Sequence, residues 1–129
     1  MPATTHIGLC RNRRGDAMKI DLRTVGDVLV LDCRGKITLG DDTQVIRNTI
    51  SSILESGGKK IVLNLAEVPY IDSSGIGELV NTHNKVIKGG GQLKLLNLTK
   101  RIHESLSIMK LLFLFQVYDS EQSTVASFL

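Results

Sequence analysis

The residues best suited to carry chemistry lie in a short polar turn, Asp72-Ser73-Ser74-Gly75. A serine hydroxyl at the start of a helix can cap backbone N–H groups, which contributes about 1 kcal/mol to stability. It can also accept a phosphoryl group, and the dianion would then lie at the positive end of the helix dipole. Because Asp72 is adjacent, a phosphate here would concentrate negative charge and repel an acidic or apolar docking surface. The turn is therefore a candidate capping motif and a candidate phosphorylation switch.

This turn stands between a predicted strand and a predicted helix. The run before it, Ile61 to Leu65, is branched aliphatic and has the length of a buried strand. After the turn, side chains recur at helical spacing along one face. The residues of this stripe are Ile76, Leu79, Val80, His83, Val86 and Ile87. The sequence therefore predicts that the two serines begin an amphipathic helix.

The rest of the chain predicts strands that alternate with helices. Two extended runs, Lys19 to Thr24 and Val28 to Arg34, flank a Gly-Asp turn and predict a β-hairpin. Further helices are expected where capping residues precede helical patterns. They begin near Asp41-Asp42, Thr99 and Ser120, and the later strands are expected at 60–65, 92–96 and 112–118. This order predicts an α/β fold with a mixed sheet of about five strands and four helices, opening with an antiparallel hairpin.

Composition indicates one compact domain. The chain has 129 residues and 42% hydrophobic content, which suffices for a single core. Residues 1–17 show no period and are predicted to be a flexible N-terminal extension, so the domain is expected at 18–129. The net charge of +3 is concentrated in that extension, at Arg11, Arg13 and Arg14. With only 4% aromatic residues and no Trp, direct nucleic-acid binding is not expected.

The cysteine count and the apolar runs bear on the cellular compartment. Two cysteines, Cys10 and Cys33, imply no disulfide framework and are consistent with a reducing environment. The longest apolar run, 111–115, is too short to span a bilayer, and the first residues lack a signal-peptide pattern. We therefore expect a cytoplasmic protein without membrane insertion.

A hydrolase triad is one alternative function for the turn. Asp72, Ser73 or Ser74, and His83 supply the residue types, but neither serine lies in a Gly-x-Ser-x-Gly motif. His83 also follows Ser73 by ten residues, which is roughly 15 Å along a helix. A core or interface histidine is the favoured interpretation, and no catalytic residue is predicted.

Patterns for nucleotide or metal binding are also incomplete. Gly75-Ile76-Gly77 is half of a dinucleotide fingerprint, without the later glycine. Residues 56–60 resemble a phosphate-binding loop in composition, but they follow a predicted helix and precede a strand, which is the reverse of the required order. A magnesium pocket formed by Asp41, Asp42 and Asp72 stays open as an alternative. No metal or cofactor is part of the main hypothesis.

Three features together resemble the STAS domain family of bacterial anti-sigma factor antagonists. They are Asp72-Ser73-Ser74-Gly75-Ile76-Gly77 after a strand, Gly89-Gly90-Gly91 before Gln92-Leu93-Lys94-Leu95-Leu96, and the order of elements. The likeness runs from about Met18 to Leu129. It implies a STAS fold, in which the serine directly after the aspartate, here Ser73, is phosphorylated by a partner that is both a serine kinase and an anti-sigma factor.

The resemblance implies a non-enzymatic switch. The unphosphorylated chain would bind the kinase and free a sigma factor, and a PP2C-type phosphatase would reset it. The alternative is a STAS scaffold or regulatory subunit of a signalling or transport complex without phosphoswitching. Thr38 stands where family members often have an acidic residue. The residues expected to contact the partner are Thr38, Asp41, Asp42, Asp72, Ser74, Gly75, Ile76 and Gly77.

Overall fold

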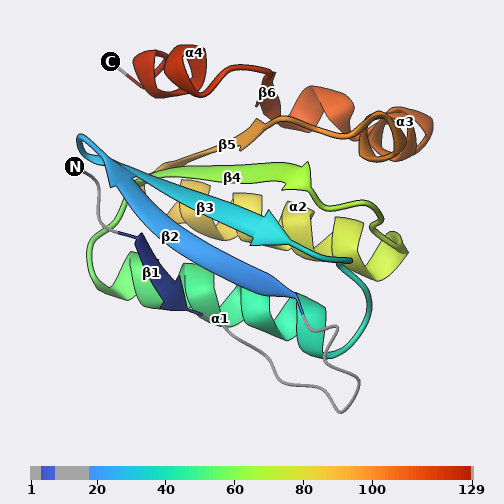
Figure 1. The fold of residues 1–129 in the computed structure, drawn as a ribbon, viewed down its shortest axis with the longest axis horizontal. Helices are drawn as coiled ribbons and strands as arrows, with labels where there is room; N and C mark the ends of the chain where they lie inside the picture. The colour runs from blue at the N-terminus through green and yellow to red at the C-terminus, as the bar shows by residue number, and fades with distance from the viewer. Residues whose placement is uncertain (1–3, 8–17, 129) are drawn as a thin grey trace.

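The computed structural model describes residues 4–7 and 18–128 and shows an α/β fold built on one mixed sheet (Figure 1). Six strands lie in the order β1-β2-β3-β4-β5-β6, so neighbours in sequence are neighbours in the sheet. The strands are β1 (Thr4–Ile7), β2 (Lys19–Val25), β3 (Val28–Arg34), β4 (Lys60–Glu67), β5 (Gln92–Leu96) and β6 (Gln116–Tyr118). The α-helices are α1 (Asp41–Glu55), α2 (Ser73–Lys88), α3 (Lys100–Ile108) and α4 (Glu121–Ala126).

The predicted hairpin is confirmed and has an additional strand beside it. β2 and β3 pair antiparallel, from Lys19 with Arg34 to Val25 with Val28, and Gly26 turns between them at φ 63°. From β3 to β6 every neighbouring pair is parallel. The helices that connect these strands explain that change, because parallel strands need a crossover connection.

Strand β1 lies inside the stretch predicted to be a flexible extension. Thr4–Ile7 pairs antiparallel with β2, so these four residues belong to the sheet. The other residues of the predicted extension, 1–3 and 8–17, lie outside the described residues. Strand β1 was missed because four residues carry too little periodicity to be recognised, and their partners lie more than ten residues away.

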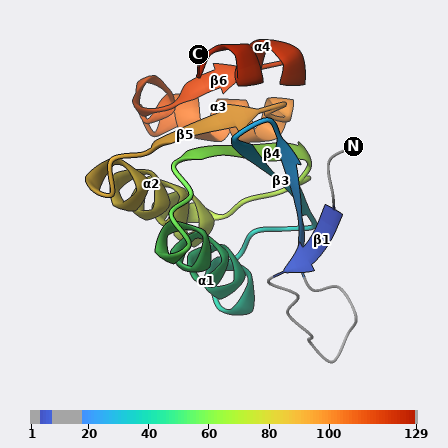
Figure 2. The same ribbon diagram turned by 90° about the vertical axis from the view of Figure 1, so that its left-hand side faces the viewer.

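The helices cover the sheet on both faces. α1 and α2 lie side by side on one face, and α4 lies on the other (Figure 2). The predicted stripe of α2 is largely confirmed, because Ile76, Leu79 and Val86 are buried. Ile87, at the edge of that stripe, is 49% exposed. α3 is capped by Thr99, as expected, and contributes Ile102 and Leu106 to the core.

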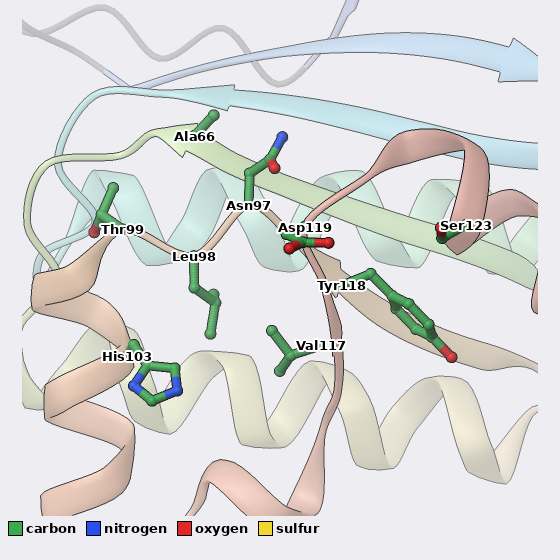
Figure 3. A pocket seen from close by; sticks show the side chains of 9 residues that line it. All are labelled: Ala66, Asn97, Leu98, Thr99, His103, Val117, Tyr118, Asp119 and Ser123. Atoms are coloured by element: carbon green, nitrogen blue, oxygen red, sulfur yellow. The ribbon is translucent and has the colours of Figure 1, made fainter.

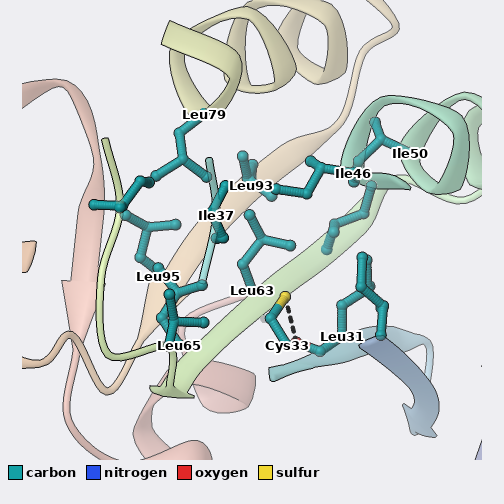
Figure 4. Close-up of a cluster of buried hydrophobic side chains, with 14 of the residues drawn as sticks. Leu31, Cys33, Ile37, Ile46, Ile50, Leu63, Leu65, Leu79, Leu93 and Leu95 are labelled. Carbon is teal, nitrogen blue, oxygen red and sulfur yellow. Dashed lines mark hydrogen bonds between the residues drawn. The ribbon is translucent and has the colours of Figure 1, made fainter. Parts of the chain in front are cut away.

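The larger core fills the space between the sheet and helices α1 and α2 (Figure 4). Its members come mainly from β3, β4, β5 and the two helices. Cys33 belongs to this core, and burial raises the pKa of its thiol to about 12. A smaller cluster on the opposite face packs Phe128 against Val28, Val30, Val62 and Leu96. The two clusters explain why β3 to β5 are apolar on both faces.

The predicted last strand is shorter than expected. Its first part, Leu112–Leu114, forms a 3₁₀ turn, and pairing begins only at Gln116. Phe115 is buried, whereas Phe113 is 85% exposed. A short apolar run does not by itself distinguish a strand from a turn of helix, so the sequence could not place this boundary.

Candidate functional site

The candidate site forms where the loop after β3 meets the turn before α2. Ile37 and Ile71 make a parallel β-bridge outside the main strands. The Ile37 N–H donates to the Tyr70 carbonyl at 3.0 Å, and the Asp72 N–H donates to the Ile37 carbonyl at 3.2 Å. Both isoleucines are buried, so the two segments are fixed by packing as well as by hydrogen bonds. Residues more than thirty positions apart therefore share one surface.

Asp72 is the N-cap of α2 and also holds the neighbouring loop. Its backbone is extended, and its Oδ1 accepts a hydrogen bond from the Gly75 N–H at 2.8 Å. Its Oδ2 accepts a second one from the Leu39 N–H at 3.1 Å. Capping by a serine hydroxyl, considered from the sequence, is therefore wrong, because the aspartate occupies the N-cap position.

The two serines differ in exposure. Ser73 is the first residue of α2 and is exposed, whereas Ser74 is half-buried. With capping assigned to Asp72, the structure gives the Ser73 side chain no helix-capping role. The hydroxyl lies at the positive end of a helix of 16 residues, where a dianion is favoured. Ser73 therefore lies at the surface, at the start of the helix.

A second carboxylate shapes the loop. Asp42 Oδ2 accepts hydrogen bonds from the Thr38 N–H at 3.1 Å and from the Thr38 hydroxyl at 2.7 Å. Gly40 is the N-cap of α1 at φ 102°, a conformation that favours glycine. Asp41 is exposed in the first turn of α1. Thr38, Asp41 and Asp42 therefore lie together beside the Ser73 turn.

The glycines of the turn have different surroundings. A Cβ on Gly75 would lie 2.5 Å from the Ile37 carbonyl oxygen and 2.6 Å from Ile71 Cγ1. Only glycine allows the loop and the helix to approach this closely. Gly77 has open space around it and is exposed. Ile76 is 3% exposed and packs in the core, so its side chain is not available to a partner.

Sequence reasoning missed two residues next to this surface. The Leu39 side chain is 76% exposed, and its backbone N–H donates to Asp72. Glu78 has a side chain only 4% exposed, and it accepts a hydrogen bond from Arg47 at 2.6 Å, which joins α2 to α1. Hydrogen bonding to Glu78 raises the pKa of the Arg47 guanidinium. A glutamate on the core side of a predicted helix was the available signal for this pair.

The described residues do not bring together the side chains considered for a hydrolase triad or a metal site. The His83 ring lies edge-on against Phe115 at 5.3 Å, while both Asp72 oxygens accept hydrogen bonds from backbone amides. Within residues 4–7 and 18–128, no group of three or more His, Cys, Asp or Glu side chains is arranged to hold a metal ion. Residues 56–60 end α1 and enter β4, as expected for a helix stop.

A pocket lies elsewhere, at the carboxyl ends of β4, β5 and β6 (Figure 3). It holds about 770 Å³ and is lined by Ala66, Asn97, Leu98, Thr99, His103, Val117, Tyr118, Asp119 and Ser123. None of the residues predicted for the phosphorylation site or the partner surface lines it. The Ser73 turn is exposed and lies outside this pocket.

Comparison with known proteins gives the family. Residues 19–124 match the STAS domain model, which is most of the chain. The chain belongs to the STAS domain family. The fold predicted from the STAS resemblance is confirmed by the structure and by this match. In the described part of this STAS protein, no helix is both long and apolar enough to cross a membrane.

Two curated relatives and one solved structure illustrate the similarity. The anti-sigma-B factor antagonist of Bacillus subtilis is 40% identical over 58 residues, which cover 45% of this chain and 52%, about half, of the relative. The anti-sigma F factor antagonist of Paenibacillus polymyxa is 22% identical over 81% of this chain and 89% of its own. The Bacillus cell fate determinant SpoIIAA, solved in its phosphorylated form, superposes with a TM-score of 0.67 at 20% identity, covering 85% of this chain and 99% of SpoIIAA.

Proposed function

We propose that this STAS protein is an anti-sigma factor antagonist controlled by phosphorylation of Ser73. The unphosphorylated chain binds an anti-sigma factor that is also a serine kinase, and a sigma factor is thereby released. The observation that carries the proposal is an exposed Ser73 hydroxyl, free of a capping role, at the start of α2 beside the Thr38–Asp42 loop. The names of the relatives and the phosphorylated form of SpoIIAA support the same role.

The physical basis of the switch is a change of charge on a preformed surface. Phosphorylation adds a dianion next to the Asp72 carboxylate and close to Asp41 and Asp42. The helix dipole stabilises this dianion in the free chain. A partner that covers the turn must desolvate it, so binding is weakened after transfer.

The chain supplies no catalysis in this scheme. The kinase binds ATP and transfers the γ-phosphoryl group to the Ser73 oxygen, whose proton is lost, and ADP leaves with the kinase. A PP2C-type phosphatase hydrolyses the phosphoserine and returns the protein to its binding state. The exposure of Ser73 supports access by both enzymes. The cytoplasm, where sigma factors act, is the proposed location.

The test is phosphosite mapping combined with binding measurements. The purified chain is incubated with ATP and each candidate switch kinase of the source organism, and the products are mapped by mass spectrometry. Phosphate on Ser73 is expected, and Ser73→Ala should abolish transfer while it keeps binding. Ser73→Asp should bind the kinase at least tenfold more weakly.

Ser107→Ala serves as the control, because Ser107 is an exposed serine on α3 and lies outside the predicted partner surface. It should keep both phosphorylation and binding. Equal kinase affinity of the Ala and Asp variants at position 73 would contradict the switch. Absence of transfer to Ser73 by every such kinase would do the same, and would favour a constitutive STAS scaffold.

A further inference from the structure

Leu39 is an exposed apolar side chain beside the proposed phosphorylation site. It is 76% exposed, whereas its neighbours Ile37 and Ile71 are buried. A single exposed leucine on a protein surface is ordinary. The way in which this leucine is held, and its place next to Ser73, are what distinguish it.

Carboxylates hold the backbone amides of Thr38 and of Leu39 itself. The Thr38 N–H and hydroxyl donate to Asp42, and the Leu39 N–H donates to Asp72. Gly40 then adopts φ 102° and begins α1. An exposed side chain on a loop that is already ordered loses little backbone entropy on binding. Leu39 is therefore presented to the outside on a rigid loop.

The register of the two segments places Leu39 next to Ser73. Ile37 and Ile71 form a parallel bridge. Leu39 follows Ile37 by two residues, and Ser73 follows Ile71 by two residues. Asp72 connects them directly, because it precedes Ser73 and accepts the hydrogen bond from the Leu39 N–H. The other strongly exposed apolar residues described, Ile108 and Phe113, belong to α3 and the 3₁₀ turn.

We infer that Leu39 is the apolar anchor by which the chain docks on the Ser73 kinase. This inference rests on the proposed function. The partner surface it requires is an apolar pocket next to the ATP site, at the distance that separates Leu39 from Ser73. Anchors of this kind dominate binding energy where they are fully desolvated. A phosphate on Ser73 would lie at the edge of the same pocket of the kinase. Phosphorylation would therefore also weaken the contact between Leu39 and that pocket.

The test uses full-length variants of the chain and the kinase that phosphorylates Ser73 in the mapping experiment. Leu39→Ala should weaken binding at least tenfold and raise the KM for phosphorylation, with kcat changed less than threefold. Leu39→Met should bind the kinase with an affinity within about threefold of that of the original chain, because methionine has a similar apolar volume. Phe113→Ala, an equally exposed apolar truncation at a distant site, should leave both values unchanged.

The outcomes separate this inference from the function on which it rests. If the original chain is phosphorylated on Ser73 but Leu39→Ala has unchanged affinity and KM, the role proposed for Leu39 is wrong. The proposed phosphorylation switch is then unaffected. If no kinase phosphorylates Ser73, both are wrong. Circular dichroism and melting curves of each variant establish that weakened binding comes from a folded protein.

Discussion

Asp72 performs two structural roles with one side chain. One carboxylate oxygen caps α2 at Gly75, and the other holds the loop after β3 at Leu39. Because the residue before Ser73 supplies the cap, the Ser73 hydroxyl has no capping role. A capping residue that also bridges two segments contributes to stability and to the shape of the proposed partner surface.

Replacement of Asp72 by Ala should lower the free energy of unfolding by about 1–2 kcal/mol, because both hydrogen bonds are lost. Asp72→Asn should cost less, since asparagine also caps helices well. Ser73→Ala should change stability by less than about 0.5 kcal/mol, as expected for an exposed side chain without a cap. Urea unfolding followed by circular dichroism measures all three. A Ser73→Ala loss as large as that of Asp72→Ala would contradict the assignment of the cap.

At the scale of elements, the start of α2 has one closely packed glycine, Gly75, and one exposed glycine, Gly77. Its first turn packs under the loop after β3, and its next turn faces outward at Gly77. The helix also carries Glu78, which binds Arg47 of α1. The start of α2 is thus held on two sides, by the loop and by α1, while Gly77 is exposed.

Two glycine substitutions in α2 should have opposite effects. Gly75→Ala places a Cβ 2.5 Å from the Ile37 carbonyl oxygen, and because a backbone atom cannot move aside cheaply, we expect a loss of about 1–3 kcal/mol. Gly77→Ala meets nothing within 4 Å and should stabilise the helix by about 0.5–1 kcal/mol. Thermal and urea unfolding of this matched pair measure the difference. Equal effects would show that the first turn does not pack as described.

At the scale of the whole molecule, a polar network joins the hairpin to α4. Arg23 of β2 binds Asp32 of β3 and Glu121 of α4, and Asn64 of β4 donates to Asp32 at 2.8 Å. Burial alone would raise the pKa of Asp32. The hydrogen bonds from Arg23 and Asn64, with the Arg23 charge, outweigh burial and hold that pKa below its usual value. Hydrogen bonds to Asp32 and Glu121 raise the pKa of the Arg23 guanidinium.

Stability should therefore fall in acid. The pKa of Asp32 is lower in the folded chain than in the unfolded chain, so its contribution is complete above the unfolded value of about 4 and is lost as pH falls through the folded value. Asp32→Asn should unfold more easily at pH 7 and should lose less stability between about pH 5 and pH 2. Glu104→Gln, an exposed carboxyl on α3, is the control. Parallel pH profiles for Asp32→Asn and the original chain would contradict the role of this network.

The sequence by itself determined the alternation of strands and helices, the hairpin at 19–34 and the polar turn at Asp72-Ser73. These features depend on local periodicity and on turn chemistry, which neighbouring residues settle. Only the tertiary structure decided that Thr4–Ile7 joins the sheet, that Asp72 rather than a serine caps α2, and that Leu39 stands beside Ser73. The first and the third depend on contacts between segments far apart in the chain, which no local pattern encodes. The cap is a local contact, but the sequence offers three adjacent residues that can cap a helix, and only the structure shows at which one the helix begins.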